Sequence, residues 1–540
     1  MRVWIRLSAL MALLALAAPA RAQHDHGGAP PERLGKVDFE TSCNAAVKPA
    51  FNRSVALVHS FWWNAAVEGF QGVLEQDPAC GMAYWGLAMA YYGNPFAGIK
   101  AADVLEPGAK AIARGLEVGA STERERAYLQ AAAALYKDFR TTDQRTRTLA
   151  YEESMARVTK AYPDDREAIA FYALALSQNA LPSDKTYAKQ KQAGEMLERL
   201  FRDRPEHPGL AHYIIHAYDY PPLAPKALDA ARRYAGIAPD APHALHMPSH
   251  TFTRVGSWEE SIETNRLSAE AARRVNQPGE VLHALDYQAY AYLQTAQDRA
   301  ALRVVGEMQT AAAALPPTNV YAGVGQYAQA AIAARYALER GAWREAATLK
   351  ATQTPVPWIA AVTHYARALG AARAGDAAAA RQEVATLGTL QQALVGKDVY
   401  WAEQVAIQQD VANAWIAYAD GRKDEGIAQL RAAADREDKT DKSAVSPGPL
   451  APARELLGDM LLDANQAAAA LVAFEQTMAK EPNRFRSLSG AARAAGKAGD
   501  QAKAVALSQK LIALSARGDG DRPELAEARR LASGSASSAR

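Results

Sequence analysis

The chain has 540 residues, of which 49% are hydrophobic, 22% charged and 8% aromatic. This composition is that of a globular protein, and it excludes a wholly disordered or collagen-like chain. The net charge of +2 is too balanced for a nucleic-acid-binding surface, so we expect no nucleic-acid partner. Alanine runs such as 131–134 and 377–380 favour closely packed helices, because alanine is the best helix former.

The amino-terminal segment has the three parts of a secretory signal peptide. Arg2 and Arg6 precede an apolar run over 7–18, and a small-x-small cleavage site ends at Ala22. The apolar run is too short to span a bilayer, and no later stretch approaches 18 uninterrupted apolar residues. We therefore exclude residues 1–22 from the fold and expect a periplasmic or secreted protein with no membrane span after cleavage.

The chain contains two cysteines, Cys43 and Cys80, which both lie in the predicted exported part. A lone pair of cysteines in an oxidising compartment predicts a disulfide, whereas the alternative is two inert buried thiols. The bridge would close a loop of 37 residues. Chain entropy gives such a bridge roughly 3–4 kcal/mol of stabilisation.

A period of 34 residues organises much of the sequence. Pro208–Ala241 and Pro242–Val275 are consecutive units of this length, and His212 and His216 recur 34 positions later as His246 and His250. The same frame fits residues 47–80 and 451–516, where each unit predicts two helices. Small residues occupy the helix crossing, and a large aromatic residue fills the space beside it.

Near the carboxyl end the spacing of Leu457-Gly458, Ala470, Phe474 and Pro482 resembles the tetratricopeptide repeat (TPR). This resemblance implies an all-α fold, a TPR-like α-solenoid in which helix–turn–helix repeats form a right-handed superhelix. The segments 207–216 (HPGLAHYIIH) and 243–250 (HALHMPSH) also resemble those of a group of exported bacterial TPR-domain proteins. That second resemblance supports the fold and export, and it implies no particular activity.

The predicted organisation has one internal break. Residues 38–435 form an amino-terminal and central helical array, and residues 451–530 form carboxyl-terminal TPR repeats. Between them, residues 436–450 are charged and then rich in Pro and Gly, which predicts a loop. The flanking segments 23–37 and 531–540 are polar or small and are expected to be disordered tails.

Histidine placement is the most informative feature for function, because six of the eleven histidines fall between His207 and His250. Two pairs are spaced by four residues, so each pair lies on one helix face. Packed helices lie ~8–10 Å apart, which allows imidazoles of adjacent units to meet. The residues predicted to bind one transition-metal ion, with copper and zinc preferred, are His212, His216, His246 and His250.

The TPR resemblance also implies which places line the concave groove. The groove residues implied by that frame are His59, Asp219, His243, His283, Asp286 and Tyr290. They are candidate further ligands or contacts for a protein, a peptide or a small molecule. Pro248 disfavours helical geometry at Met247, which would put His246 just before the helix rather than on it.

Three functions are compatible with these residues. The first is an exported solenoid that binds a ligand or partner in its groove together with a His-bound transition metal. The second is a metal-dependent hydrolase or oxidoreductase at the same histidines, where a metal-bound water would react. The third is a metal-free protein–protein scaffold. The sequence lacks a His-Glu-x-x-His pattern, a Gly-x-Ser-x-Gly elbow and a phosphate-binding loop, so no motif identifies an enzyme.

Overall fold

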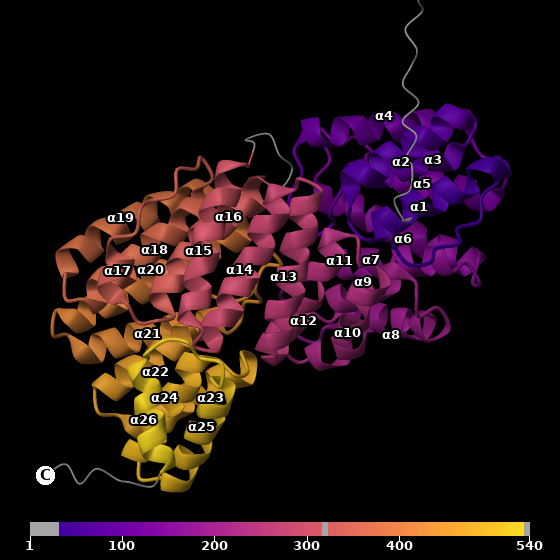
Figure 1. Ribbon diagram of the computed structural model, residues 1–540. Coiled ribbons are helices and arrows are strands. Elements are labelled where there is room, and N and C mark those ends of the chain that lie inside the picture. Colours follow the sequence, from indigo (N-terminus) through magenta and orange to yellow (C-terminus); the bar gives the residue numbers. More distant parts are fainter. Residues whose placement is uncertain (1–31, 316–321, 534–540) are drawn as a thin grey trace, which may run out of the picture. The chain divides into compact units, whose positions relative to one another are not determined.

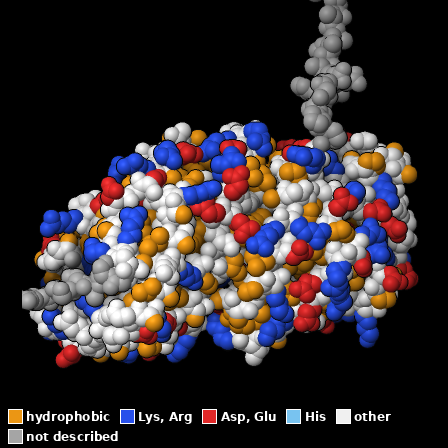
Figure 2. Space-filling model, turned by 60° about the horizontal axis from the view of Figure 1, so that its bottom comes forward, with side chains coloured by type: hydrophobic (Ala, Val, Ile, Leu, Met, Phe, Trp, Pro, Cys, Tyr) orange, Lys and Arg blue, Asp and Glu red, His pale blue; other side chains and the backbone are white. Residues whose placement is uncertain are grey.

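The computed structural model describes residues 32–315 and 322–533, and every regular element within these ranges is a helix (Figure 1). The predicted signal peptide and residues 23–31 of the predicted tail lie outside the described residues. Basic and acidic side chains alternate over the face in Figure 2, in keeping with the balanced charge. Among the described residues, no helix is long and apolar enough to cross a membrane.

The first half of the array contains α1 (Lys48–His59), α2 (Trp63–Gln76), α3 (Gly81–Tyr92), α4 (Ala102–Val118), α5 (Glu123–Ala134), α6 (Gln144–Ala161), α7 (Arg166–Gln178), α8 (Ala188–Asp203), α9 (Pro208–Ala217), α10 (Leu228–Ile237), α11 (Pro242–His246), α12 (Pro248–Val255) and α13 (Trp258–Arg274). Short 3-10 turns, Ala45–Val47 and Ala224–Ala227, precede α1 and α10.

The second half contains α14 (Pro278–Gln294), α15 (Asp298–Ala313), α16 (Ala322–Leu338), α17 (Trp343–Ala347), α18 (Pro357–Arg373), α19 (Ala377–Leu394), α20 (Val399–Ala419), α21 (Lys423–Glu437), α22 (Ala453–Asp463), α23 (Ala467–Lys480), α24 (Phe485–Lys497), α25 (Gln501–Leu514) and α26 (Pro523–Ala532).

Consecutive helices pack as hairpins, and each hairpin packs against the next one along the chain. The repeat residues explain this packing. Phe474 of α23 is fully buried between α22 and α24, where Gly458 and Gly490 leave room for its ring. A Cβ atom at either glycine would lie 2.7 Å or 2.3 Å from that ring, so neither position tolerates a larger residue. The predicted all-α, TPR-like solenoid is confirmed.

The carboxyl-terminal repeats also contact residues that lie 191 to 225 positions earlier in the chain. The Trp258 indole donates a hydrogen bond to the Asn483 carbonyl (2.8 Å), and the Phe485 amide donates to the Gln294 side chain (3.0 Å). Arg522 forms an ion pair with Asp298 at the start of α15. These contacts bring α24 against α14.

The loop between α21 and α22, residues 438–452, is called the strap below. It corresponds to the predicted loop at 436–450. Arg335 is fully buried and holds the strap by donating to the carbonyls of Gly448 (2.9 Å) and Pro449 (3.0 Å) and to the Ser446 hydroxyl (2.8 Å). The strap is therefore an ordered part of the core and not a free linker.

The described ends of the predicted tails pack against the array. Leu34 is buried, and the Lys36 amide donates to the Glu206 carbonyl (2.9 Å). Helix α26 continues to Ala532, two residues into the segment expected to be disordered. Composition alone predicts a tail at both ends. In the structure an apolar contact orders the described residues at the amino-terminal end, and a regular helix orders them at the carboxyl-terminal end.

Cys43 and Cys80 are bonded in the structure, with an S–S distance of 2.06 Å. The bridge joins the segment before α1 to the residue that precedes α3.

Replacing both cysteines by alanine is expected to lower the free energy of unfolding by roughly 3–4 kcal/mol. In a repeat protein this loss falls mainly on the neighbouring repeats, so hydrogen exchange should accelerate in α1–α3 and remain unchanged in α22–α25. Equal exchange of α1–α3 in both proteins would contradict this prediction.

Candidate metal centre

Six histidines from four helices, α9, α11, α12 and α14, form two groups in the interior. The first group, called triad A, is His212, His216 and His243; the second, triad B, is His246, His250 and His283. Within each triad, one ligand-type nitrogen per residue lies within 4.8 Å of the others. The prediction of one ion bound by His212, His216, His246 and His250 therefore differs from the structure, which divides these four residues between two groups.

Local helix geometry explains the division. On α9 the Nε2 atoms of His212 and His216 lie 3.1 Å apart, because residues four apart share a helix face. His246 and His250 have the same Nε2–Nε2 distance of 3.1 Å. Each pair is thus complete within its own repeat. The third histidine comes from the next repeat. His243 lies in the first turn of α11, with its ring centroid 5.2 Å from that of His212, and His283 lies on α14, which packs against α11.

The interruption expected at Pro248 is slight. Helix α11 ends at His246 and α12 begins at Pro248, but Met247 between them keeps helical dihedral angles (φ −53°, ψ −36°). His246 consequently lies at the end of a helix and still faces His250.

The hydrogen bonds of triad B define which nitrogen of each ring carries the proton. The Asn265 amide nitrogen donates to the Ser261 carbonyl (2.7 Å), so its Oδ1 accepts from Nδ1 of His246 (2.7 Å). Nδ1 of His250 donates to the Asp219 carboxylate (3.0 Å). In the neutral rings both Nε2 atoms therefore present lone pairs to each other at 3.1 Å. This is an unfavourable contact unless a cation lies beside it.

Triad A repeats the 3.1 Å contact between Nε2 atoms, but hydrogen bonds define the proton position of only one of the two rings, that of His212. Nδ1 of His212 donates to the His59 backbone carbonyl (2.6 Å), which leaves its Nε2 as an acceptor facing His216. The His216 ring stacks with the rings of Phe61 and Phe96. Nε2 of His243 is buried without a hydrogen-bond partner, as is Nδ1 of His283 in triad B. Each triad thus contains an unsatisfied imidazole nitrogen, which native interiors usually avoid.

Burial favours the uncharged form of five of these imidazoles. Loss of hydration lowers the pKa of His212, His216, His246 and His283 well below the ordinary value. It also lowers the pKa of His250 to about 4, although the hydrogen bond that His250 donates to Asp219 acts in the opposite direction. Burial therefore opposes placing a proton between the paired nitrogens. Neutral imidazole is the form that binds transition metals.

Asp219 connects triad B to the strap. Its carboxylate accepts from His250, from Arg254 (2.8 Å) and from the buried ammonium of Lys442 (3.1 Å). Burial would raise the pKa of Asp219, but Lys442 and Arg254 hold it well below the usual range. The same burial lowers the pKa of Lys442 to about 8. Lys442 was absent from the predicted site, because nothing in the sequence of 438–452 indicates that this loop reaches the histidines.

Tyr287 also joins the strap to the centre. Its hydroxyl lies 3.1 Å from the carbonyl oxygens of Ala444 and Ser446 and 3.4 Å from Nε2 of His250. The hydroxyl is therefore held beside the triad B nitrogens by the strap backbone. This residue was absent from the predicted site, although it lies four positions after His283 on the same helix face.

In a third group, His59, Glu167 and His207, the ligand atoms are also close enough together to bind one ion. Here, however, Glu167 accepts from Nε2 of both histidines (2.8 and 2.9 Å), and the Tyr213 hydroxyl donates to Nδ1 of His59 (2.9 Å). These hydrogen bonds satisfy the His59 ring without a cation. His59, predicted to line the groove, is instead fully buried in this group.

Asp286 and Tyr290 do not join the triads. Asp286 pairs with Arg335 (2.9 Å), and burial still raises its pKa to about 6. The Tyr290 hydroxyl accepts from Arg484 (2.6 Å) of the carboxyl-terminal repeats. Both residues are fully buried, so in the structure they stabilise the strap and the returning repeats and do not line an open groove.

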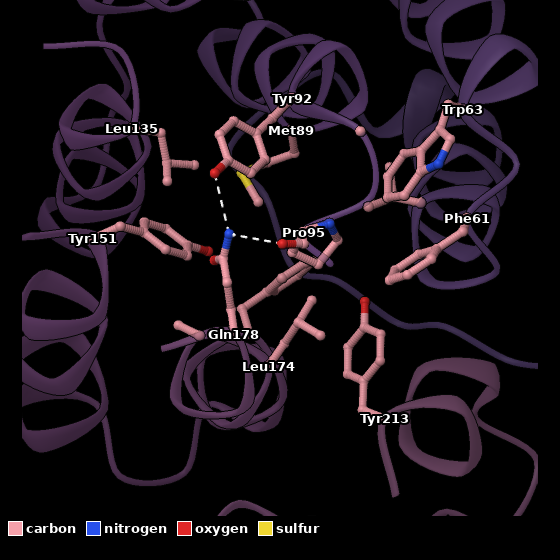
Figure 3. Close-up of a pocket in the computed structure, with 14 residues that line it drawn as sticks. Phe61, Trp63, Met89, Tyr92, Pro95, Leu135, Tyr151, Leu174, Gln178 and Tyr213 are labelled. Carbon is pink, nitrogen blue, oxygen red and sulfur yellow. Dashed lines mark hydrogen bonds between the residues drawn. The ribbon is translucent and has the colours of Figure 1, made fainter. Parts of the chain in front are cut away.

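A small apolar cavity lies beside triad A (Figure 3). Phe61, Trp63, Tyr92 and Tyr213 contribute to its wall (Figure 3). The centroid of the Phe61 ring lies 4.3 Å from that of the His212 ring. Its volume of about 20 Å³ accommodates a water-sized molecule and nothing larger without side-chain movement.

The lowered histidine pKa values predict a pH dependence for the metal-free protein. Unfolded histidines bind protons below pH ~6.5, whereas the buried His250 resists protonation until about pH 4. The unfolded state therefore binds more protons, and stability decreases as the pH falls from 6.5 to 4. Urea unfolding midpoints at several pH values measure this loss, which should be smaller in His250→Gln. A midpoint that rises towards pH 5 would contradict the prediction.

Comparisons with known proteins add little about the site. No family model matches the chain, and no curated protein matches it. Among solved structures, a human IFIT1 dimer with PPP-AAAA is 12% identical, covers 88% of this chain and 96% of its own, and gives a TM-score of 0.40. The IFIT1 dimer with m7Gppp-AAAA gives a TM-score of 0.32 at the same identity, covering 81% and 90%.

Proposed function

We propose that this protein is an exported helical repeat protein that binds transition-metal ions at triads A and B. The observation that supports this most strongly is the 3.1 Å contact between the Nε2 lone pairs of His246 and His250. An ion ~2.1 Å from both atoms would be bonded at an angle of about 95°, which suits tetrahedral or square geometries. The third histidine of the triad supplies a further nitrogen.

The surroundings support the same proposal. Metal-binding histidines usually donate their other ring N–H to a carbonyl or a carboxylate, which fixes the ring. His212, His246 and His250 each do so, through the His59 carbonyl, Asn265 and Asp219. Six uncharged nitrogen donors without a thiolate favour copper or zinc over harder ions.

Export remains part of the proposal, and it rests on the amino-terminal sequence pattern and on the fully paired cysteines. The disulfide suits an oxidising compartment. A periplasmic or secreted protein would meet its metal outside the cytoplasm.

The experiment is elemental analysis of the untagged protein secreted or exported by its own signal peptide. We expect copper or zinc at one or more equivalents per chain, released by acid because the imidazoles must be neutral to bind. Purified protein that contains no transition metal, and that takes up neither Cu(II) nor Zn(II) after dialysis against a chelator, would refute the proposal.

A further inference from the structure

We infer that triads A and B form one binuclear centre, in which two metal ions are bridged by a small anionic ligand that the protein does not provide. This inference rests on the proposed metal binding and adds to it the number of ions, their proximity and the class of ligand they take. It comes from the contacts between the triads and from the charges around them.

The two triads adjoin each other. Across their boundary, ring centroids are separated by 6.0 Å for His243 and His246 and by 6.2 Å for His216 and His250. Inside the triads the corresponding separations are 4.8 Å for His212 and His216, and 6.4 Å for His250 and His283. Rings of different triads are therefore as close as some rings that share a triad. Two ions bound here would be close neighbours, as in binuclear metal sites, where they lie ~3.5–4 Å apart.

The repeat explains why the centre is double. His246 and His250 lie 34 positions after His212 and His216, and successive repeats pack side by side. The same pair is thus presented twice towards one interior space. The backbone break at Pro248 does not disturb the second copy, because the Nε2–Nε2 distance is 3.1 Å in both.

The charge balance implies an external ligand. Six neutral imidazoles contribute no negative charge to two cations. The nearest carboxylate that contacts a triad B ring, Asp219, is already paired with Arg254 and Lys442. Glu280 approaches triad A, with an oxygen 3.8 Å from Nδ1 of His243. One carboxylate at that distance leaves most of the positive charge uncompensated in a buried site, which favours a small anion between the ions.

Three nitrogen donors leave each ion with open coordination positions, which is the condition for binding such a ligand. Hydroxide and azide have the required size and charge. Tyr287, whose hydroxyl lies 3.4 Å from Nε2 of His250, is positioned beside this ligand.

The test is a Cu(II) titration of the metal-free, untagged full chain followed by electron paramagnetic resonance. His24 and His26, near the predicted mature terminus, are replaced by alanine so that they do not bind copper. We expect the chain to bind two equivalents of Cu(II). Binding of the second equivalent should lower the integrated paramagnetic resonance signal per copper, through spin coupling or broadening. Addition of azide should then change the optical spectrum. His283→Gln should bind one equivalent with a full signal, as should His243→Gln.

The outcomes separate this inference from the proposed function. Two equivalents with two full, unbroadened signals, or only one equivalent in the parent chain, would overturn the binuclear centre and leave metal binding intact. No binding of copper at all would refute both. Far-ultraviolet circular dichroism of each variant tests whether it is folded. The matched control is His364→Ala, which changes a histidine that pairs with Glu383 on a distant hairpin. This variant should bind as much copper as the parent chain and give the same signal.

Discussion

Replacing His212 and His246 together by alanine is expected to remove the bound transition metal from the purified protein. Each residue supplies one Nε2 of a paired contact, so the double variant damages both triads at once. We expect metal affinity to fall by at least about 100-fold, since loss of even an outer hydrogen-bond partner costs about 10–100-fold. The measurement is metal per chain by elemental analysis after identical purification.

Two control variants make this result specific. His207→Gln alters a buried histidine whose ring bonds to Glu167 and lies outside both triads. His364→Ala alters a partly exposed histidine on α18. Both should retain the metal content of the parent. Equal metal content in the parent and in the His212→Ala/His246→Ala protein would show that the triads do not bind the ion.

Arg484→Met is expected to give the largest loss of stability, about 3–5 kcal/mol, because it removes one partner of a buried ion pair. Arg484 is fully buried and donates to Glu455 (2.9 and 3.0 Å), to Glu339 (2.9 Å) and to the Tyr290 hydroxyl. The methionine would leave two carboxylates in the interior without their common cation. Urea unfolding followed by tryptophan fluorescence measures the change.

The matched control is Arg422→Met, which removes an exposed guanidinium paired with Asp420 and Glu425. Surface ion pairs contribute only about 0–1 kcal/mol, so this variant should unfold almost as the parent does. Similar losses in the two variants would indicate that Arg484 contributes no more than a surface charge, which contradicts its role in joining α14, α16, α22 and α24.

The helical array was predictable because its determinants are local. The 34-residue spacing, alanine at the helix crossings and Phe474 opposite glycine all act within one hairpin or between neighbours. The pairing of His212 with His216 was predictable for the same reason, since residues four apart share a helix face whatever surrounds them.

The division into two triads could not be predicted from the sequence, because it depends on how the helices pack in three dimensions. Which histidine completes each pair depends on how far α11 and α14 are shifted along their neighbours, and no spacing within the sequence gives that shift. Asp286 and Tyr290 lie on the expected helix face, but each is bonded to an arginine from a later helix hairpin. Arg335, 49 residues away, pairs with Asp286, and Arg484, 194 residues away, donates to Tyr290. Lys442 contacts Asp219 across 223 residues from a loop whose charged, Pro- and Gly-rich composition predicts only a connection between helices.

These differences change the interpretation of the interior. The inner face of the central repeats was expected to be a concave groove open to a partner. In the structure Lys442 of the strap contacts Asp219, and Arg484 of the returning repeats contacts Tyr290. His59 is fully buried against Glu167, so these residues do not line an open groove. A buried set of uncharged imidazoles suits an ion or a small ligand better than a peptide.

Anomalous diffraction from crystals of the untagged protein, recorded at the absorption edge of the metal it contains, tests the central claim most directly. The account predicts a peak within ~2.0–2.3 Å of Nε2 of both His246 and His250, and a second peak at the same distances from His212 and His216. Anomalous density only at other positions, with the paired imidazole nitrogens bonded to water or to each other through a proton, would contradict it.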